Sequence, residues 1–151
     1  MKTLLITLLV LAAAIVLWIR YSPIDRDAWH VDPADAGDLG RSGVKLIGLD
    51  APRFAADPDT VLETIHEIAL SEPRTRLLDG DTDEGMLTFV VRSRTIGFAD
   101  FITVKAVSEG RKTKLSVASR PRAGAKAYDW GVNAKRIDRW MQEMRLRLGQ
   151  G

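Results

Sequence analysis

The sequence of 151 residues contains no cysteine and only two histidines. The absence of cysteine excludes a disulfide framework, a thiol nucleophile and any thiolate metal site. His30 and His66 are far apart in the sequence, and neither belongs to a metal-binding spacing such as H-E-x-x-H. We therefore expect both histidines at the surface or at the edge of the core, and we expect no metal and no cofactor.

Three other signatures of chemistry are incomplete or missing. The sequence has no G-x-S-x-G nucleophile elbow, so serine-hydrolase chemistry has no positive signal. Gly37, Gly40 and Gly43 lack the preceding strand, the following helix and the Lys-Ser/Thr pair of a phosphate-binding loop. The alternating aspartates of residues 79–83 lack the sixth-position Gly and twelfth-position Glu of an EF-hand, which favours a charged hairpin turn.

Charge is nearly balanced over the whole chain, with 22 basic and 20 acidic side chains, but it is unevenly distributed. Residues 21–90 hold 6 basic and 15 acidic side chains, whereas residues 91–151 hold 14 basic and 5 acidic. This asymmetry is typical of a basic half that meets an anionic partner, or of two halves that neutralise each other. We expect the second, because the totals match closely. Whether the halves meet within one molecule or between two stays open.

One long apolar run is present near the start of the chain. Thr3–Ile19 is seventeen residues without a charge, and eleven of them are Leu, Ile or Val. A helix of that length spans about 26 Å, close to the thickness of a bilayer's hydrocarbon core. Trp18 and Tyr21 stand where interfacial aromatics lie, and Lys2 and Arg20 flank the run. The pattern predicts a membrane-spanning helix.

A cleaved signal peptide is the alternative interpretation of this run. Its cleavage site requires small residues after the apolar stretch, whereas here Ala12–Ala14 lie inside the stretch and the bulky residues 17–21 end it. We therefore expect residues 1–21 to be an uncleaved anchor. The basic residues on the two sides are nearly tied in number, and the short head that carries Lys2 favours an N-in orientation. This predicts a single-pass protein of the bacterial inner membrane with a periplasmic soluble part.

The soluble part divides into a spacer and a domain. Residues 22–58 are rich in Asp, Pro, Gly and Ala and are predicted to be a spacer that ends in a short apolar piece, Val44–Leu49. Residues 59–149 are predicted to be an α+β domain with the order helix, four strands, helix. Helical and alternating apolar patterns predict helices at Thr60–Ser71 and Asn133–Leu148 and strands at Arg74–Leu78, Met86–Thr95, Phe101–Val107 and Lys112–Arg120.

Short turns join these strands, so neighbouring strands are expected to be antiparallel. Both helices have one apolar stripe, which predicts that they pack together on one face of the sheet. Thr60 and Glu63 have the spacing of a capping box, and Asn133 is a plausible N-cap of the last helix.

The second half of the chain contains the densest grouping of polar side chains. Asp129 and Arg136 are close enough in sequence to pair around the start of the last helix. Two interpretations stay open: a structural cluster with a buried Asp and a clamping Arg, or a site for a ligand or partner. The candidate residues are Arg92, Arg94, Asp100, Ser119, Arg120, Asp129, Asn133 and Arg136.

The same residues carry a resemblance to a known family. The segments Pro73–Leu78 and Arg92–Asp100, with its Phe-x-Asp corner, are two parts of it. Ser119–Arg120 followed by Asp129–Ile137, which reads Asp-Trp-Gly-Val-Asn-Ala-Lys-Arg-Ile, is the third. Together they resemble the signature of the bacterial and plastid family catalogued as domain of unknown function 1499, over about residues 48–146.

The resemblance implies a fold and a membrane or envelope setting, but no known reaction. The sequence departs from the family pattern in three places. Pro121 and Arg122 stand between Ser119-Arg120 and the Ala-Gly pair that follows, the stretch from Gly124 to Asp129 is two residues longer than the family spacing, and the early Asn-Cys-Val piece is missing.

These observations bear on three classes of function. A non-enzymatic envelope module, anchored by residues 3–19, would bind a lipid-like ligand or a protein partner, and the anchor and the basic half favour it. A hydrolase-type enzyme would use Asp100 or Asp129 with His30 or His66, and requires these side chains to converge in a cleft. Nucleic-acid binding is not expected, because few aromatics stand between the basic residues of the strands.

Overall fold

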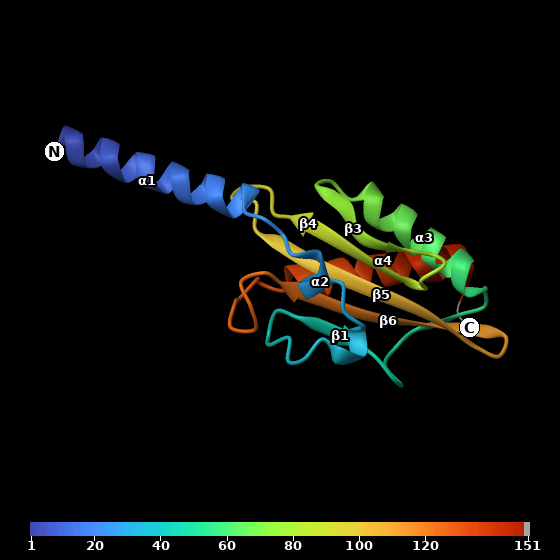
Figure 1. Ribbon diagram of the computed structural model, residues 1–151. Coiled ribbons are helices and arrows are strands. Elements are labelled where there is room, and N and C mark those ends of the chain that lie inside the picture. Colours follow the sequence, from blue (N-terminus) through green and yellow to red (C-terminus); the bar gives the residue numbers. More distant parts are fainter. Residues whose placement is uncertain (150–151) are drawn as a thin grey trace.

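The structure of the protein, a computed structural model that describes residues 1–149, is built on an antiparallel sheet (Figure 1). Its strands are β1 (Val44–Leu46), β2 (Arg53–Phe54), β3 (Thr75–Asp81), β4 (Met86–Arg92), β5 (Ala99–Glu109) and β6 (Lys112–Pro121). Its helices are α1 (Lys2–Tyr21), α2 (Arg26–Trp29), α3 (Pro58–Ser71) and α4 (Val132–Leu148), with a short 3-10 helix η1 (Pro33–Asp35). The strand order is β1-β6-β5-β4-β3, and β2 also pairs with β6.

The predicted α+β class and the antiparallel arrangement are confirmed. The four predicted strands correspond to β3–β6. Two short strands are added by residues 44–54, inside the segment that we expected to be a spacer: Val44 lies opposite Ser119, and Arg53 lies opposite Lys114. This segment therefore extends the sheet along the β6 edge.

Helices α3 and α4 pack on the same face of the sheet and enclose the larger core (Figure 1). Successive side chains of a strand alternate between its two faces, so Leu87, Phe89 and Val91 of β4 all point toward these helices. Each fully buried apolar side chain stabilises the fold by about 1.5–3 kcal/mol. The largest fully buried members are Phe54, Phe89, Leu62, Ile65, Ile102, Leu115, Ile137 and Met144.

Helix α3 begins two residues before the predicted start. Its N-cap is Asp57, whose carboxylate accepts hydrogen bonds from the Thr60 backbone N–H at 2.9 Å and the Thr60 hydroxyl at 2.8 Å. Pro58 occupies the first helical position, where its fixed φ fits and no N–H is required. The capping box predicted for Thr60 and Glu63 is therefore wrong, because Asp57 already satisfies the free N–H groups of the first turn.

The opposite face of the sheet is covered by the residues that follow α1. Trp29 stacks on Phe101 with ring centroids 3.9 Å apart, and the Arg120 guanidinium lies 5.1 Å from the Trp29 ring. Thr103 and Arg120 both donate hydrogen bonds to the Trp29 carbonyl oxygen. A second, smaller core forms here around Leu78, Val90, Ala99 and Phe101. Residues 22–43 therefore belong to the packed structure.

Helix α1 projects away from the sheet and buries none of its side chains (Figure 1). Its 20 residues correspond to about 30 Å of helix. By length and composition it is able to cross a membrane. An apolar run of this length, left uncovered by the rest of the fold, is unusual for a helix surrounded by water.

Replacing Trp29 by Ala tests the role of residues 22–43 in the fold. We expect the free energy of unfolding to fall by about 2 kcal/mol, since the substitution removes a stacked aromatic ring from a partly covered core. Chemical denaturation measures this change, and Trp130→Ala serves as the control because Trp130 is 79% exposed. Equal stability of Trp29→Ala and wild type would show that this segment is a loose spacer.

Candidate functional site

Two loops lie at the end of the sheet from which α1 projects: loop 93–98 between β4 and β5, and loop 122–131 between β6 and α4 (Figure 1). Hydrogen bonds join this end of the sheet to the end of α1 and the residues after it. Arg92 Nη1 donates to the carbonyl oxygens of Gly97 at 2.9 Å and Ile19 at 3.3 Å. Arg122 donates to the carbonyl oxygens of Pro23 at 2.7 Å and Ser22 at 3.4 Å.

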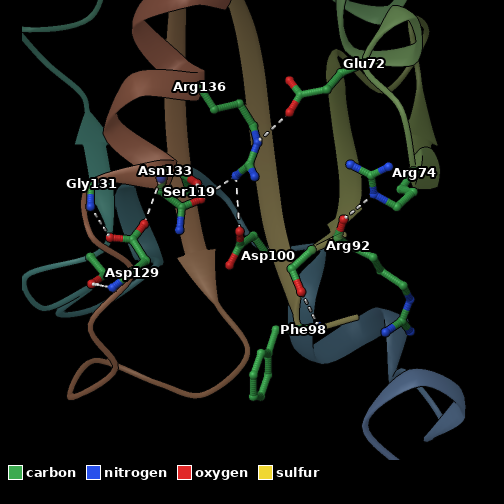
Figure 2. A network of polar contacts seen from close by, with 12 residues as sticks. Glu72, Arg74, Arg92, Phe98, Asp100, Ser119, Asp129, Gly131, Asn133 and Arg136 are labelled. Atoms are coloured by element: carbon green, nitrogen blue, oxygen red, sulfur yellow. Dashed lines mark hydrogen bonds and ion pairs between the residues drawn. The ribbon is translucent and has the colours of Figure 1, made fainter. Parts of the chain in front are cut away.

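A network of polar side chains lies just inside this end, between the sheet and α4 (Figure 2). Asn133 Oδ1 accepts hydrogen bonds from the Ser119 hydroxyl at 2.6 Å and from Arg136 Nη1 at 2.8 Å. The same Arg136 nitrogen lies 3.2 Å from Asp100 Oδ2. These four residues, from β5, β6 and α4, are all among those that the sequence predicted to cluster.

Arg136 also reaches the end of α3. Its Nε donates to Glu72 Oε1 at 3.1 Å, and Trp140 Nε1 donates to Glu72 Oε2 at 2.9 Å. The predicted pairing of Arg136 with Asp129 is therefore wrong: the guanidinium points toward the sheet and α3 (Figure 2). The sequence held one weak signal for Glu72, an acidic residue directly before the helix-ending Pro73.

Asp129 instead caps the start of α4. Its two carboxylate oxygens accept the backbone N–H groups of Gly131 at 2.9 Å and Asn133 at 2.7 Å. Partial burial acts to raise its pKa, but these hydrogen bonds, together with those of the Ser42 and Asn133 side chains, outweigh it and hold the pKa of Asp129 below its usual value. The expectation that Asn133 is the N-cap is wrong, since Gly131 holds that position in a left-handed conformation with φ of 77°.

The pKa of Asp100 is shifted in the opposite direction. Burial raises the pKa of its carboxyl group above the usual value, although the neighbouring Arg136 guanidinium acts to lower it. Asp100 also lines a pocket. A molecule bound in that pocket would therefore be able to contact this carboxyl group of the network. A carboxyl group of this kind is able to hold or donate a proton at higher pH than a free aspartate.

The pocket has a volume of about 510 Å³ and opens between loop 93–98 and loop 122–131. Asp100 and Asp129 form its polar side. Its apolar side includes Phe98, Tyr128 and Trp130, of which Tyr128 and Trp130 are 62% and 79% exposed and pack edge to face at 4.9 Å. We call it the aromatic pocket. Its size lies within the range of small-molecule sites.

The remaining predicted residues lie outside the network. Arg120 is on the other face of the sheet, over Trp29. Arg92 ends β4, so the predicted strand to Thr95 is too long and Arg94 lies exposed in loop 93–98. The physical reason is that the Ser93 hydroxyl accepts the N–H groups of Gly97 and Phe98 at 3.0 Å, which closes a turn directly after the strand.

The two histidines lie apart from the aromatic pocket. The ring nitrogens of His30 each lie 2.8 Å from an oxygen, one of Thr88 and one of Glu84. His66, on α3, packs against Phe89 with ring centroids 6.0 Å apart. Among residues 1–149, neither histidine forms a hydrogen bond or ion pair with Asp100 or Asp129.

The family comparison matches the part of the chain that contains this site. The family described as "Protein of unknown function (DUF1499)" matches residues 47–144, about two thirds of the chain. The chain belongs to this family. The DUF1499 match includes the network, the aromatic pocket and both loops, and it does not include α1 or residues 22–43. No curated protein matches the chain.

The ion pairs of Arg136 predict that its removal strongly destabilises the fold. Replacing Arg136 by Ala leaves two carboxylates without their shared partner, and we expect the free energy of unfolding to fall by roughly 3–5 kcal/mol. Asp129→Ala removes the helix cap and is expected to cost about 1 kcal/mol. Thermal and chemical denaturation give both values. The exposed Arg145→Ala and Asp138→Ala on the same helix are the controls, and equal losses in a variant and its control would contradict a structural network.

The raised pKa of Asp100 predicts the direction in which the stability of the fold changes with pH. Because its pKa is higher in the folded protein than in the unfolded chain, only the folded state takes up this proton as the pH falls through the folded-state pKa. The stability of wild type relative to Asp100→Asn should therefore increase as the pH is lowered from 7 to about 4. Denaturation curves across this range test the sign, with Asp138→Asn as control. A relative stability that decreases on acidification would show that the pKa of Asp100 is not raised.

Proposed function

We propose that the protein is a membrane-anchored, non-enzymatic module that binds a lipid-like amphiphile in the aromatic pocket. The observation that carries this proposal is the position of the pocket. It opens between two loops that present Phe98, Tyr128 and Trp130, and both loops lie at the end of the sheet from which α1 projects (Figure 1). Aromatic side chains of this kind favour the boundary between hydrocarbon and water, and an acyl chain matches the apolar lining.

The anchor supports the same proposal. Residues 3–19 are an uncharged run, and α1 leaves their apolar side chains uncovered. With α1 in the bilayer, Trp18 and Tyr21 lie at its surface, and loop 93–98 and loop 122–131 face the headgroups. We infer a single-pass protein of the bacterial inner membrane whose folded part lies in the periplasm, where it meets lipids or lipid-like envelope compounds.

Binding accounts for the polar network better than catalysis does. Asp129 is committed to capping α4, and Arg136 to two carboxylates, so both act as structural supports of the pocket wall. Such supports hold a binding surface in place without taking part in a reaction.

A hydrolase remains the second candidate because of one observation. Asp100 lines the pocket and burial raises its pKa, which suits a general acid. In this alternative Asp100 works without histidine, since His30 is held by Thr88 and Glu84. An Asp100→Asn variant separates the two functions. The amide keeps the size of the side chain, so a binding module still copurifies with its amphiphile, whereas an enzyme accumulates uncleaved substrate.

Mass spectrometry of organic extracts tests the binding function. The full chain is purified gently from native membranes beside a Tyr128→Ala/Trp130→Ala variant, and Leu146→Ala is the control because Leu146 is an exposed apolar residue of α4. We expect a stoichiometric amphiphile in wild type and control, and at least a tenfold loss in the double variant, on the order of the 1–2 kcal/mol that burial of apolar groups contributes. Identical lipid profiles in all three would overturn the proposal and favour a protein partner.

A further inference from the structure

Arginines from several elements gather on the other side of loop 93–98, around the base of α1. A cleft of about 550 Å³ lies among Arg20 of α1, Arg26 of α2, Arg76 of β3 and Arg92 of β4. An adjoining cleft of about 330 Å³ shares three of these residues and adds Arg74. We call the two together the arginine cleft. No segment of the sequence shows this grouping, because its members come from residues 20–92 and meet only in the fold.

The positive charges in the arginine cleft lack acidic partners. Within residues 1–149, no carboxylate lies within ion-pair distance of any of its five arginines. Arg92 and Arg74 donate instead to backbone carbonyl oxygens. The nearby Asp25 carboxylate accepts the Asp27 backbone N–H.

Other arginines of the protein behave differently. Arg53, Arg136 and Arg147 each have a glutamate partner at 2.8–3.1 Å. In the arginine cleft, partial burial and then the charges of Arg76, Arg122 and Arg20 lower the pKa of the Arg92 guanidinium. The folded protein therefore keeps mutually repelling charges together, and a bound anion would relieve this repulsion.

The place of the cleft identifies the kind of anion. Arg20 directly follows Ile19, where the uncharged run ends, and Tyr21 and Ser22 also line the cleft. With α1 inserted as proposed above, the cleft lies at the level of the lipid phosphates. Guanidinium groups bind phosphate oxygens in pairs of parallel hydrogen bonds, and Ile24 and Leu78 give the cleft an apolar wall.

We propose that the arginine cleft binds the phosphate headgroup of an anionic membrane phospholipid. This site is separate from the aromatic pocket, and it rests on the proposed membrane insertion of α1. Its role is to fix the folded part against the bilayer surface, which brings the mouth of the aromatic pocket to the headgroup layer.

Lipid binding by the full chain in detergent micelles tests this site. Native mass spectrometry measures the affinity for phosphatidylglycerol, with phosphatidylcholine and inorganic phosphate as separate probes. The test variant is Arg26→Gln/Arg76→Gln, since both side chains are exposed and neither makes a side-chain hydrogen bond within residues 1–149. The control is Arg111→Gln/Arg145→Gln, which changes the net charge equally at exposed positions outside the cleft.

We expect wild type and control to bind phosphatidylglycerol at least tenfold more tightly than phosphatidylcholine, and the cleft variant to lose roughly this factor. An equal loss in the control would overturn the proposal in favour of net charge alone. Binding of inorganic phosphate with the same affinity as phosphatidylglycerol would show that the cleft binds free phosphate, and would overturn the lipid headgroup as its ligand. Absence of any preference in wild type would also overturn it.

The proposals for the two sites can be tested independently of each other. The Tyr128→Ala/Trp130→Ala variant should keep its preference for phosphatidylglycerol, and the cleft variant should keep the amphiphile that copurifies with wild type. A cleft variant that melts at the wild-type temperature but loses both ligands would show that the arginine cleft and the aromatic pocket are one site, and would contradict the separate headgroup site.

Discussion

The buried guanidinium of Arg136 joins α4 to β5 and to the end of α3 through ion pairs. It belongs to α4, contacts Asp100 of β5 and Glu72 after α3, and is 5% exposed. A buried charge of this kind is tolerated only when its partners surround it, so the three elements are fixed relative to one another. The start of α4 is held in turn by Asp129, and loop 122–131 is thereby placed beside loop 93–98. The aromatic pocket between them depends on this chain of contacts.

The uneven charge of the sequence has a structural explanation. Acidic side chains of the first half pair with basic side chains of the second: Asp32 with Lys105, Glu67 with Arg147, and Glu72 with Arg136 and Arg139. Three acidic side chains of the first half thus find their basic partners within one molecule. The arginines of the arginine cleft are not part of this pairing, so the end of the sheet beside α1 is left positively charged.

The sequence predicted the elements that have a regular apolar pattern. The stripes of α3 and α4 and the alternation of β4–β6 were sufficient for the α+β class. The covering of the second face by Trp29 was missed because residues 22–43 show no period and fold only against the sheet. Likewise, side-chain spacing placed Asp129 near Arg136, yet backbone hydrogen bonding at the start of α4 and the position of Glu72 decided their partners.

The grouping of arginines illustrates a different limit of prediction from the sequence. Arg20, Arg26, Arg76 and Arg92 belong to four elements, and only the strand order and the path of residues 22–43 bring them together. No spacing rule applied to one segment is able to find such a site. The polar cluster was partly predictable because several of its members lie within one loop and one helix, and because the family resemblance included them.

We propose that the end of the sheet beside α1 faces the lipid surface and binds it. Photo-crosslinking of the full chain in vesicles with a headgroup-labelled anionic phospholipid, followed by peptide mapping, tests this most directly. We expect crosslinks in loop 93–98, in loop 122–131 and around Arg76, in addition to the end of α1. Crosslinks confined to α1, or concentrated at the β5–β6 turn around Arg111, would contradict it.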